Sequence, residues 1–341
     1  DSYPVTQGIL DEVQWLPQSR ADINSQGEGA LPVLCVAAFT GDVQWVQLLL
    51  EQSAEIERGD ALDQTPLSLA AEEGHIDVVR LLLQNEAEIE REDRRKQTPL
   101  SLAARKGNLQ IVELLLEKRA EIKTKNVYDR TPFDLAKENG HAKVEALFLL
   151  DEAQKGNLDK VQWLLQSRAD INSQLEDGRT SLYVAAKNGH SEIVELLLEK
   201  EAELEAKDDS QRTALSRAAE EGHINVVRLL LQNEAEIEEG CCGQTPVSFA
   251  AENGNLEIVK LLLEKKAEIT TKNEYDQTPF DLAEENGHAK VAALLLRHER
   301  KGDWNVEQLC SLISLHNQDV VVGQIETKRI QQIHRMKTVL P

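Results

Sequence analysis

The stretch T-P-L-S-L-A-A-E-E-G-H, from Thr65 to His75, decides the fold of this chain. The hydroxyl of Thr65 is suited to capping a helix, and Pro66 suits the first helical position. The small and apolar residues that follow predict a short helix that allows close approach of a neighbour. Gly74 predicts its end, because a tight turn between helices needs a residue that tolerates positive φ.

A second helix is predicted directly after this turn, over residues 76–84 (I-D-V-V-R-L-L-L-Q). Val78, Leu81 and Leu82 have the i, i+3, i+4 spacing of an apolar stripe. The charged segment 85–97 then returns the chain to the next threonine and has room for an extended β-turn finger. One such unit is therefore a pair of helices followed by a finger.

The glycine that ends the first helix recurs along the chain at a nearly fixed period. Its positions are Gly8, Gly41, Gly74, Gly107 and Gly140, then Gly156, Gly189, Gly222, Gly254 and Gly287. Within each set the interval is 33 residues, apart from one of 32. A period of this size predicts a stack of similar small units, none of which buries its apolar face alone. Such a solenoid offers a long continuous surface and rarely a closed catalytic pocket.

The repeated pattern T-P-L-x-x-A-A-x-x-G-H, followed by V-x-L-L-L and A-E-I, resembles the ankyrin repeat. The matches to its first three residues begin at Thr65, Thr98, Thr131, Thr245 and Thr278, with looser versions at Pro32, Thr180 and Thr213. The resemblance covers about residues 5 to 299. It implies an all-α ankyrin-repeat solenoid with β-turn fingers and about ten units, partial ones included.

One departure from the family pattern concerns the glycine expected just before the A-D-V-N segment. Its place is taken by Ser53, Glu86, Arg119, Glu201, Glu234 and Lys266. If this position is left-handed, each replacement costs roughly 1 kcal/mol.

The array contains an internal duplication. Residues 14–24 (Q-W-L-P-Q-S-R-A-D-I-N) return with one change at 162–172, an offset of 148, and residues 80–90 return unchanged at 228–238. We therefore predict three parts. These are 1–150, a first array of an amino-terminal half unit and four repeats with the last one truncated; 151–299, a second array that duplicates it; and 300–341, a carboxy-terminal helical cap or tail.

The seam between the two copies is too short for a complete repeat. Residues 141–156 cannot hold a second helix, a finger and a first helix. We predict one helix that runs on into the first helix of the next layer. A hinge and a fixed kink are both compatible with this reading.

Composition disfavours several classes of partner. The chain has 38 basic and 60 acidic residues, a net charge of −22, which repels nucleic acid and anionic lipid. No apolar run approaches the roughly 18 residues of a membrane span, so we expect no membrane insertion. The four cysteines (Cys35, Cys241, Cys242, Cys310) lack disulfide or zinc spacing, which indicates a reducing compartment. We expect an intracellular protein, cytoplasmic or nuclear, or in a host cytoplasm if it is a secreted effector.

No constellation in the sequence predicts catalysis. Five of the eight histidines follow a repeat glycine, and their period explains them as turn residues. The vicinal pair Cys241–Cys242 has no second pair or nearby histidine to complete a metal site. We expect no cofactor, no metal site and no enzyme activity.

We predict a monomeric scaffold or adaptor that binds another protein through fingers and inner helices. An alternative is the recognition region of a larger effector or enzyme whose catalytic domain lies outside this chain. The resemblance implies that the partner contacts finger tips and the exposed ends of first helices. The corresponding residues are Arg94, Arg95, Gln97, Arg105, Lys106, Tyr128, Arg130, Glu138, Asn139 and Tyr275.

The duplication distinguishes framework from surface. Residues 94–96 (R-R-K) correspond to C-C-G at 241–243, and Arg105–Lys106 to Glu252–Asn253. Different partner demands and neutral drift both predict such a change. The four cations Arg94, Arg95, Arg105 and Lys106 favour an acidic partner segment. We predict that Arg95→Glu with Arg105→Glu weakens binding by at least roughly 2 kcal/mol and leaves melting nearly unchanged.

Overall fold

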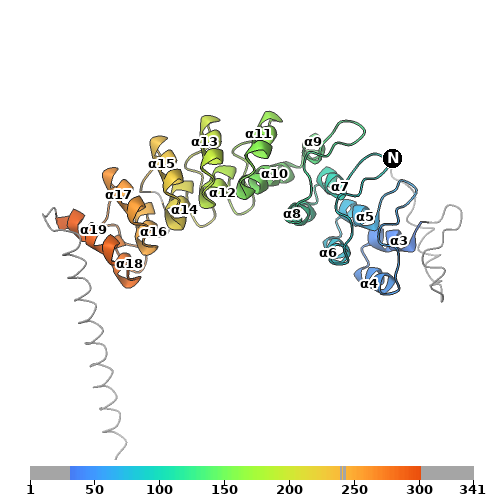
Figure 1. Ribbon diagram of the computed structural model, residues 1–341, viewed down its shortest axis with the longest axis horizontal. Helices are drawn as coiled ribbons and strands as arrows, with labels where there is room; N and C mark the ends of the chain where they lie inside the picture. Colours follow the sequence, from blue (N-terminus) through green and yellow to red (C-terminus); the bar gives the residue numbers. More distant parts are fainter. Residues whose placement is uncertain (1–30, 239, 241–242, 301–341) are drawn as a thin grey trace, which may run out of the picture. The chain divides into compact units, whose positions relative to one another are not determined.

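The computed structural model describes residues 31–238, 240 and 243–300. Every regular secondary-structure element in this part of the chain is an α-helix, and the helices follow one another in pairs (Figure 1). The predicted all-α repeat fold is confirmed. The amino-terminal half unit, the finger tip at Cys241–Cys242 and the segment 301–341 lie outside the described residues.

The described helices fall into two compact units, one through Asp151 and one from Glu152. The first unit contains α3 (Val33–Thr40), α4 (Val43–Glu51), α5 (Pro66–Glu73), α6 (Ile76–Gln84), α7 (Pro99–Lys106), α8 (Leu109–Glu117) and α9 (Pro132–Glu138). The second contains α11 (Leu158–Gln166), α12 (Ser181–Lys187), α13 (Ser191–Glu199), α14 (Ala214–Glu221), α15 (Ile224–Gln232), α16 (Pro246–Glu252), α17 (Leu256–Glu264), α18 (Pro279–Glu285) and α19 (Ala289–Arg300). Helix α10 (Ala142–Lys155) crosses the boundary.

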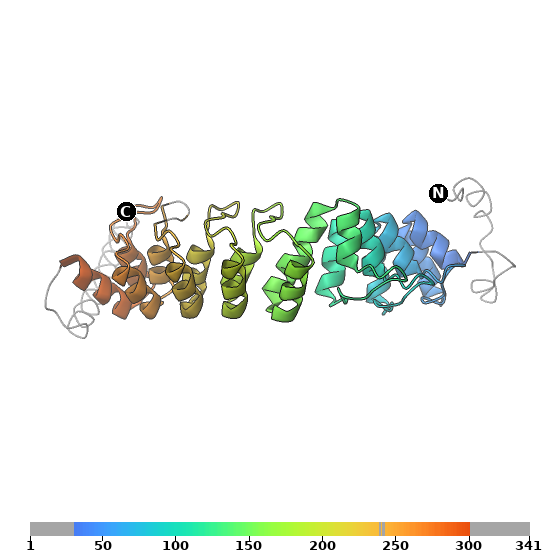
Figure 2. The same ribbon diagram turned by 90° about the horizontal axis from the view of Figure 1, so that it is seen from above.

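Within each unit the first helices of successive repeats pack side by side, and the second helices form a second row (Figure 2). The first row, called the inner helices below, is α3, α5, α7 and α9 in the first unit and α12, α14, α16 and α18 in the second. The alanines at the centre of the inner helices are fully buried, for example Ala70, Ala71, Ala103 and Ala104. Small side chains thus let neighbouring repeats approach closely, as the sequence predicted.

The inner helices begin as the sequence indicates. Thr65 Oγ1 accepts a hydrogen bond from the backbone N–H of Ser68 at 3.2 Å, and Pro66 takes the first helical position. Thr131 and Asp134 go further and form a reciprocal capping box at the start of α9. Helix α6, the second helix of the repeat that begins at Thr65, differs from prediction in one detail. Val78, Val79 and Leu82 are buried, whereas Leu81 is only half-buried.

The residue after the turn glycine joins the turn to the preceding repeat through a side-chain hydrogen bond. His141 Nε2 lies 2.9 Å from the carbonyl oxygen of Arg105, 36 residues earlier. The ring packs on Gly107, where an added Cβ would lie 2.5 Å from His141 Nδ1. Equivalent contacts to carbonyl oxygens are made by His75, Asn108, His190, His223 and Asn255. The predicted role of the histidines as turn residues is confirmed, and the contact adds a second reason for glycine.

Wherever it falls within the described residues, the position at which the family favours glycine before the A-D-V-N segment is left-handed. All six replacements named above have φ between 62° and 68°, and Arg168 has φ 64°. L-residues disfavour this conformation by about 1–2 kcal/mol. The chain therefore carries repeated local strain at the end of its second helices.

The seam contains the single long helix that was predicted. Helix α10 has 14 residues, against seven to nine in the described helices before it. Phe148 and Leu149 are completely buried, and the ring of Phe148 meets that of Phe133 edge-on at 6.2 Å. The single helix α10 thus replaces the second helix of one repeat, the following finger and the first helix of the next repeat.

Candidate functional site

Each candidate finger is a tight loop closed by its own first residue. Asp93 Oδ1 accepts hydrogen bonds from the backbone N–H groups of Arg95 and Gln97, both at 2.8 Å. Lys96, the fourth residue, is left-handed with φ 55°. Asp60, Asn126 and Asn273 close their fingers in the same way. The sequence signal for this closure is an Asp or Asn five residues before the helix-capping threonine, and sequence reasoning missed it.

A second contact ties each of these fingers to the end of its inner helix. Gln97 Oε1 accepts a hydrogen bond from Arg105 Nη1 at 3.4 Å, eight residues later. The same spacing joins Gln64 to Glu72, Arg130 to Glu138, Gln244 to Glu252 and Gln277 to Glu285. We call this contact the finger clasp. It holds the finger against the helix that supports it.

Three of the four candidate cations are compensated by the preceding repeat. Arg94 Nε lies 2.9 Å from Asp63 Oδ2, in the neighbouring finger. Arg105 Nη2 and Lys106 Nζ lie 2.7 and 3.5 Å from the same oxygen of Glu72. The side chain of Arg95 is exposed and makes no ion pair or hydrogen bond among the described residues. The cationic island predicted from the sequence is therefore reduced to Arg95 and its neighbour Lys96.

The remaining candidates divide between exposed and structural positions. Tyr128 is 68% exposed and Tyr275 is 74% exposed, each at the tip of its finger. Gln97 is buried, at 4% exposure, and Asn139 Nδ2 donates to the carbonyl of Leu135 at the end of α9. Gln97 thus supports the surface from beneath, whereas Asn139 is exposed with its amide bonded to the end of α9. Tyr275 belongs to the second unit.

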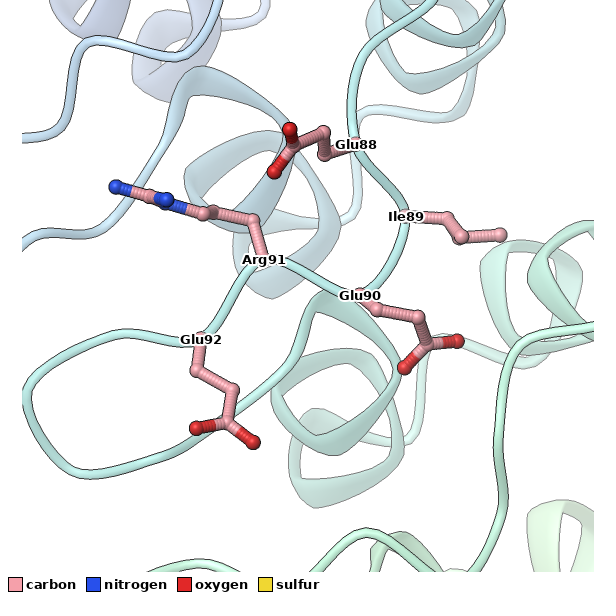
Figure 3. A pocket seen from close by; sticks show the side chains of 5 residues that line it. All are labelled: Glu88, Ile89, Glu90, Arg91 and Glu92. Carbon is pink, nitrogen blue, oxygen red and sulfur yellow. The ribbon is translucent and has the colours of Figure 1, made fainter.

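An open hollow lies beside the return loop that precedes the Asp93 finger, lined by residues 88–92 (Figure 3). Its carboxylates have neighbours in the adjoining repeats. Glu90 Oε1 accepts a hydrogen bond from the backbone N–H of Glu121 at 2.8 Å, and Glu57 does the same for Glu88 at 2.7 Å. Burial raises the pKa of Glu57 despite this hydrogen bond. These glutamates join successive loops, which gives the hollow a structural role.

The second unit holds a buried polar cluster on its inner side. Tyr183 Oη donates to Asp208 Oδ2 at 2.6 Å, and Arg212 Nη2 lies 3.2 Å from the same oxygen. Arg217, in α14, is buried and pairs with Glu220 and Glu221. The corresponding residues of the first unit include Cys35, whose pKa is raised by burial to about 12. No group of three or more potential metal ligands occurs within the described residues.

Comparison with protein families accounts for this architecture. A family model of ankyrin repeats in three copies matches residues 5–93, 149–241 and 236–308. The chain belongs to the ankyrin repeat family. A second model, of ankyrin repeats in many copies, matches residues 82–136. No curated protein sequence matches this ankyrin chain. Among its described helices, none has both the length and the apolar character needed to cross a bilayer.

Proposed function

We propose that this ankyrin chain is a binding scaffold with no catalysis of its own, and that the fingers and inner helices of its first unit form the docking surface. Ankyrin repeats are in general modules for protein–protein interaction. Finger clasps occur in both units, and the observation that favours the first unit is the pair of exposed side chains Arg95 and Tyr128 on two adjacent clasped fingers. Each clasp fixes an exposed tip on a supporting helix.

Fixed tips favour binding because few loops and side chains of the scaffold lose conformational freedom when the partner binds. Arg95 and Tyr128 are the exposed anchors on this surface, and Arg and Tyr are enriched among residues that dominate binding energy. The backbone N–H of Arg95 donates to the side chain of Asp93, and that of Tyr128 donates to the side chain of Asn126, so both tips have a fixed backbone. We place the interaction inside a cell, because Cys35 is a buried free thiol.

Site-directed photo-crosslinking tests the proposal. A photoreactive amino acid is placed at Arg95, at Tyr128 and, as a control, at Arg80, which is exposed on the second helix α6. The full chain is then irradiated in an extract, and crosslinked proteins are identified by mass spectrometry. We expect the same protein to be captured from positions 95 and 128 and not from position 80. Capture of that protein from position 80 alone contradicts the proposed surface.

A further inference from the structure

The finger tips of neighbouring repeats are joined by main-chain hydrogen bonds. The backbone N–H of Arg94 donates to the carbonyl of Leu62 at 2.9 Å, and that of Val127 donates to Arg95 at 3.0 Å. In the second unit, Asp209 donates to Asp177 at 2.9 Å. In these three fingers the residue after the closing Asp or Asn, here called the first tip residue, donates to the finger before it. The acceptor there is the residue after the first tip residue, here called the second tip residue. We call this series the finger ladder.

In the first unit the finger ladder ends at Tyr128. This is the second tip residue of its finger, so its carbonyl holds the place that Leu62 and Arg95 occupy in theirs. The inner helix α9 and then α10 follow, and the unit ends at Asp151 without another finger. Among the described residues, no hydrogen bond reaches the Tyr128 carbonyl oxygen. An acceptor on an open ladder edge is a position that an extended chain can pair with.

The side chains around this acceptor are apolar and cationic. Val127 is 52% exposed and Tyr128 68%, and few large apolar residues of the described chain are exposed to this extent. The other charges of the tip are paired, Asp129 with Lys125 and Arg130 with Glu138. Arg95 and Lys96, on the adjacent finger, are exposed and have no ion pair. Glu92 stands further back, on the arm of that finger (Figure 3).

We propose that the tip Val127–Tyr128 docks an extended segment of a partner protein that alternates apolar and acidic residues. A main-chain N–H of this segment donates to the Tyr128 carbonyl, as Val127 does to Arg95. Its apolar side chains pack on Tyr128 and Val127, and its carboxylates reach across this tip toward Arg95 and Lys96 on the finger before it. This inference rests on the proposed scaffold function and names the chemistry of the partner.

The duplicated unit provides an internal comparison. The last finger of the described second unit also has an exposed tyrosine, Tyr275, as its second tip residue. The carbonyl of Tyr275 accepts no hydrogen bond among the described residues. Glu274 stands there in place of Val127, and Cys242 in place of Arg95. The second tip therefore keeps the aromatic ring and the acceptor but loses both the apolar neighbour and the arginine. We expect it to reject the acidic segment that the first tip binds.

The probe is a labelled synthetic peptide of four valine–glutamate repeats, titrated against the full chain by fluorescence anisotropy. We expect saturable binding that weakens as salt is added. Arg95→Glu with Lys96→Glu should weaken it at least about tenfold, and Tyr128→Ala at least about fivefold. Tyr275→Ala, the matched control, should leave it unchanged. A peptide of valine–lysine repeats should not bind.

Two N-methylated versions of the peptide test the main-chain contact. One carries N-methyl groups at every valine and the other at every glutamate, so each blocks one edge of the extended chain. We expect at least one of them to lose binding. Binding of both methylated peptides with the affinity of the parent, no binding of the parent peptide up to about 1 mM, or equal loss in Tyr128→Ala and Tyr275→Ala overturns the inference.

Failure of this inference can be distinguished from failure of the proposed scaffold function. A cellular protein captured from position 95 that still binds the Tyr128→Ala variant with full affinity overturns the inference and leaves the scaffold function standing. Peptide binding without any captured protein supports the inference and counts against the proposed function.

Discussion

Arg105 reaches back from inner helix α7 and places its Nη2 2.7 Å from Glu72 Oε1 on the neighbouring inner helix α5. Lys106 approaches the same oxygen at 3.5 Å, and Gln64 donates to the other oxygen at 3.2 Å. Glu72 therefore joins two repeats and one finger. Because Arg105 and Lys106 pair with Glu72, two of the four candidate cations are held at the inner helices and not at the exposed finger tip.

The first prediction follows from this separation. Arg105→Glu places a carboxylate beside Glu72 and should lower the free energy of unfolding by about 1 kcal/mol, since the pair is only partly exposed. Arg95→Glu should change it by less than about 0.5 kcal/mol. Urea denaturation of the two single variants measures this. Equal midpoints for both variants would contradict the role of Glu72. The double variant is thus expected to lose stability, and only Arg95→Glu reports on binding alone.

The sequence predicted the repeat well because its signals are local. The threonine cap, the proline after it and the glycine turn each act within a few residues, so Thr65, Pro66 and Gly74 could be interpreted without a structure. The length of α10 followed from counting the residues available at the seam. The sequence predicted less well which residues of a helix are buried. In α6 the predicted stripe contained Leu81, whereas the structure buries Val79 in its place.

The site was predicted less completely, because its contacts join residues of different repeats. Asp93 looks like one acid among many, yet it closes the finger. Gln97 looks exposed, yet it is buried in a finger clasp. Which carboxylate compensates Arg105 depends on the distance between α5 and α7, and no local pattern encodes that distance.

Gly107 and Gly140 provide the second prediction. Both are left-handed, with φ 79° and 74°, so alanine at either position costs about 1 kcal/mol of backbone strain. Only at Gly107 would the new Cβ collide with a ring, that of His141, whereas nothing lies within 4 Å of a Cβ at Gly140. We expect Gly107→Ala to destabilise the chain by about 1–3 kcal/mol more than Gly140→Ala, measured by urea denaturation. Similar losses at both positions would show that the histidine packing is unimportant.

The left-handed acidic residues give the third prediction. Glu86 and Glu234 occupy equivalent positions of the two copies, both with φ 66°. Glycine removes strain of about 1–2 kcal/mol, and part of that gain is offset by about 0.4–1 kcal/mol of added entropy in the unfolded chain. We expect Glu86→Gly with Glu234→Gly to raise the melting temperature, and the matched alanine pair to give no gain because alanine keeps its Cβ. A gain with alanine would point to charge as the cause.

The buried cluster of the second unit links stability to pH. Burial of the Asp208 carboxylate acts to raise its pKa, but the hydrogen bonds from Tyr183 and Arg212 and the charge of Arg212 outweigh burial, so the pKa lies below its ordinary value. A carboxyl whose pKa is lowered in the folded state stabilises the fold above its unfolded pKa of about 3.9. That contribution is lost as pH falls through the lower folded value.

The last prediction tests this linkage with Tyr183→Phe. Removal of the hydroxyl leaves the ionised Asp208 with one donor fewer and should cost about 1–3 kcal/mol near neutral pH. The difference from the wild type should begin to shrink below about pH 4 and vanish as the pH falls through the lower folded pKa of Asp208, because the carboxyl is then neutral in both proteins. Cys35→Ala changes the equivalent position of the first copy and serves as the control. Since burial raises the pKa of Cys35 to about 12, its thiol is uncharged throughout and its effect should not vary with pH in this range. Urea denaturation across the acid range measures both variants. A Tyr183→Phe deficit that stays constant from neutral pH into acid would mean that the hydroxyl acts through packing and not through the charge of Asp208.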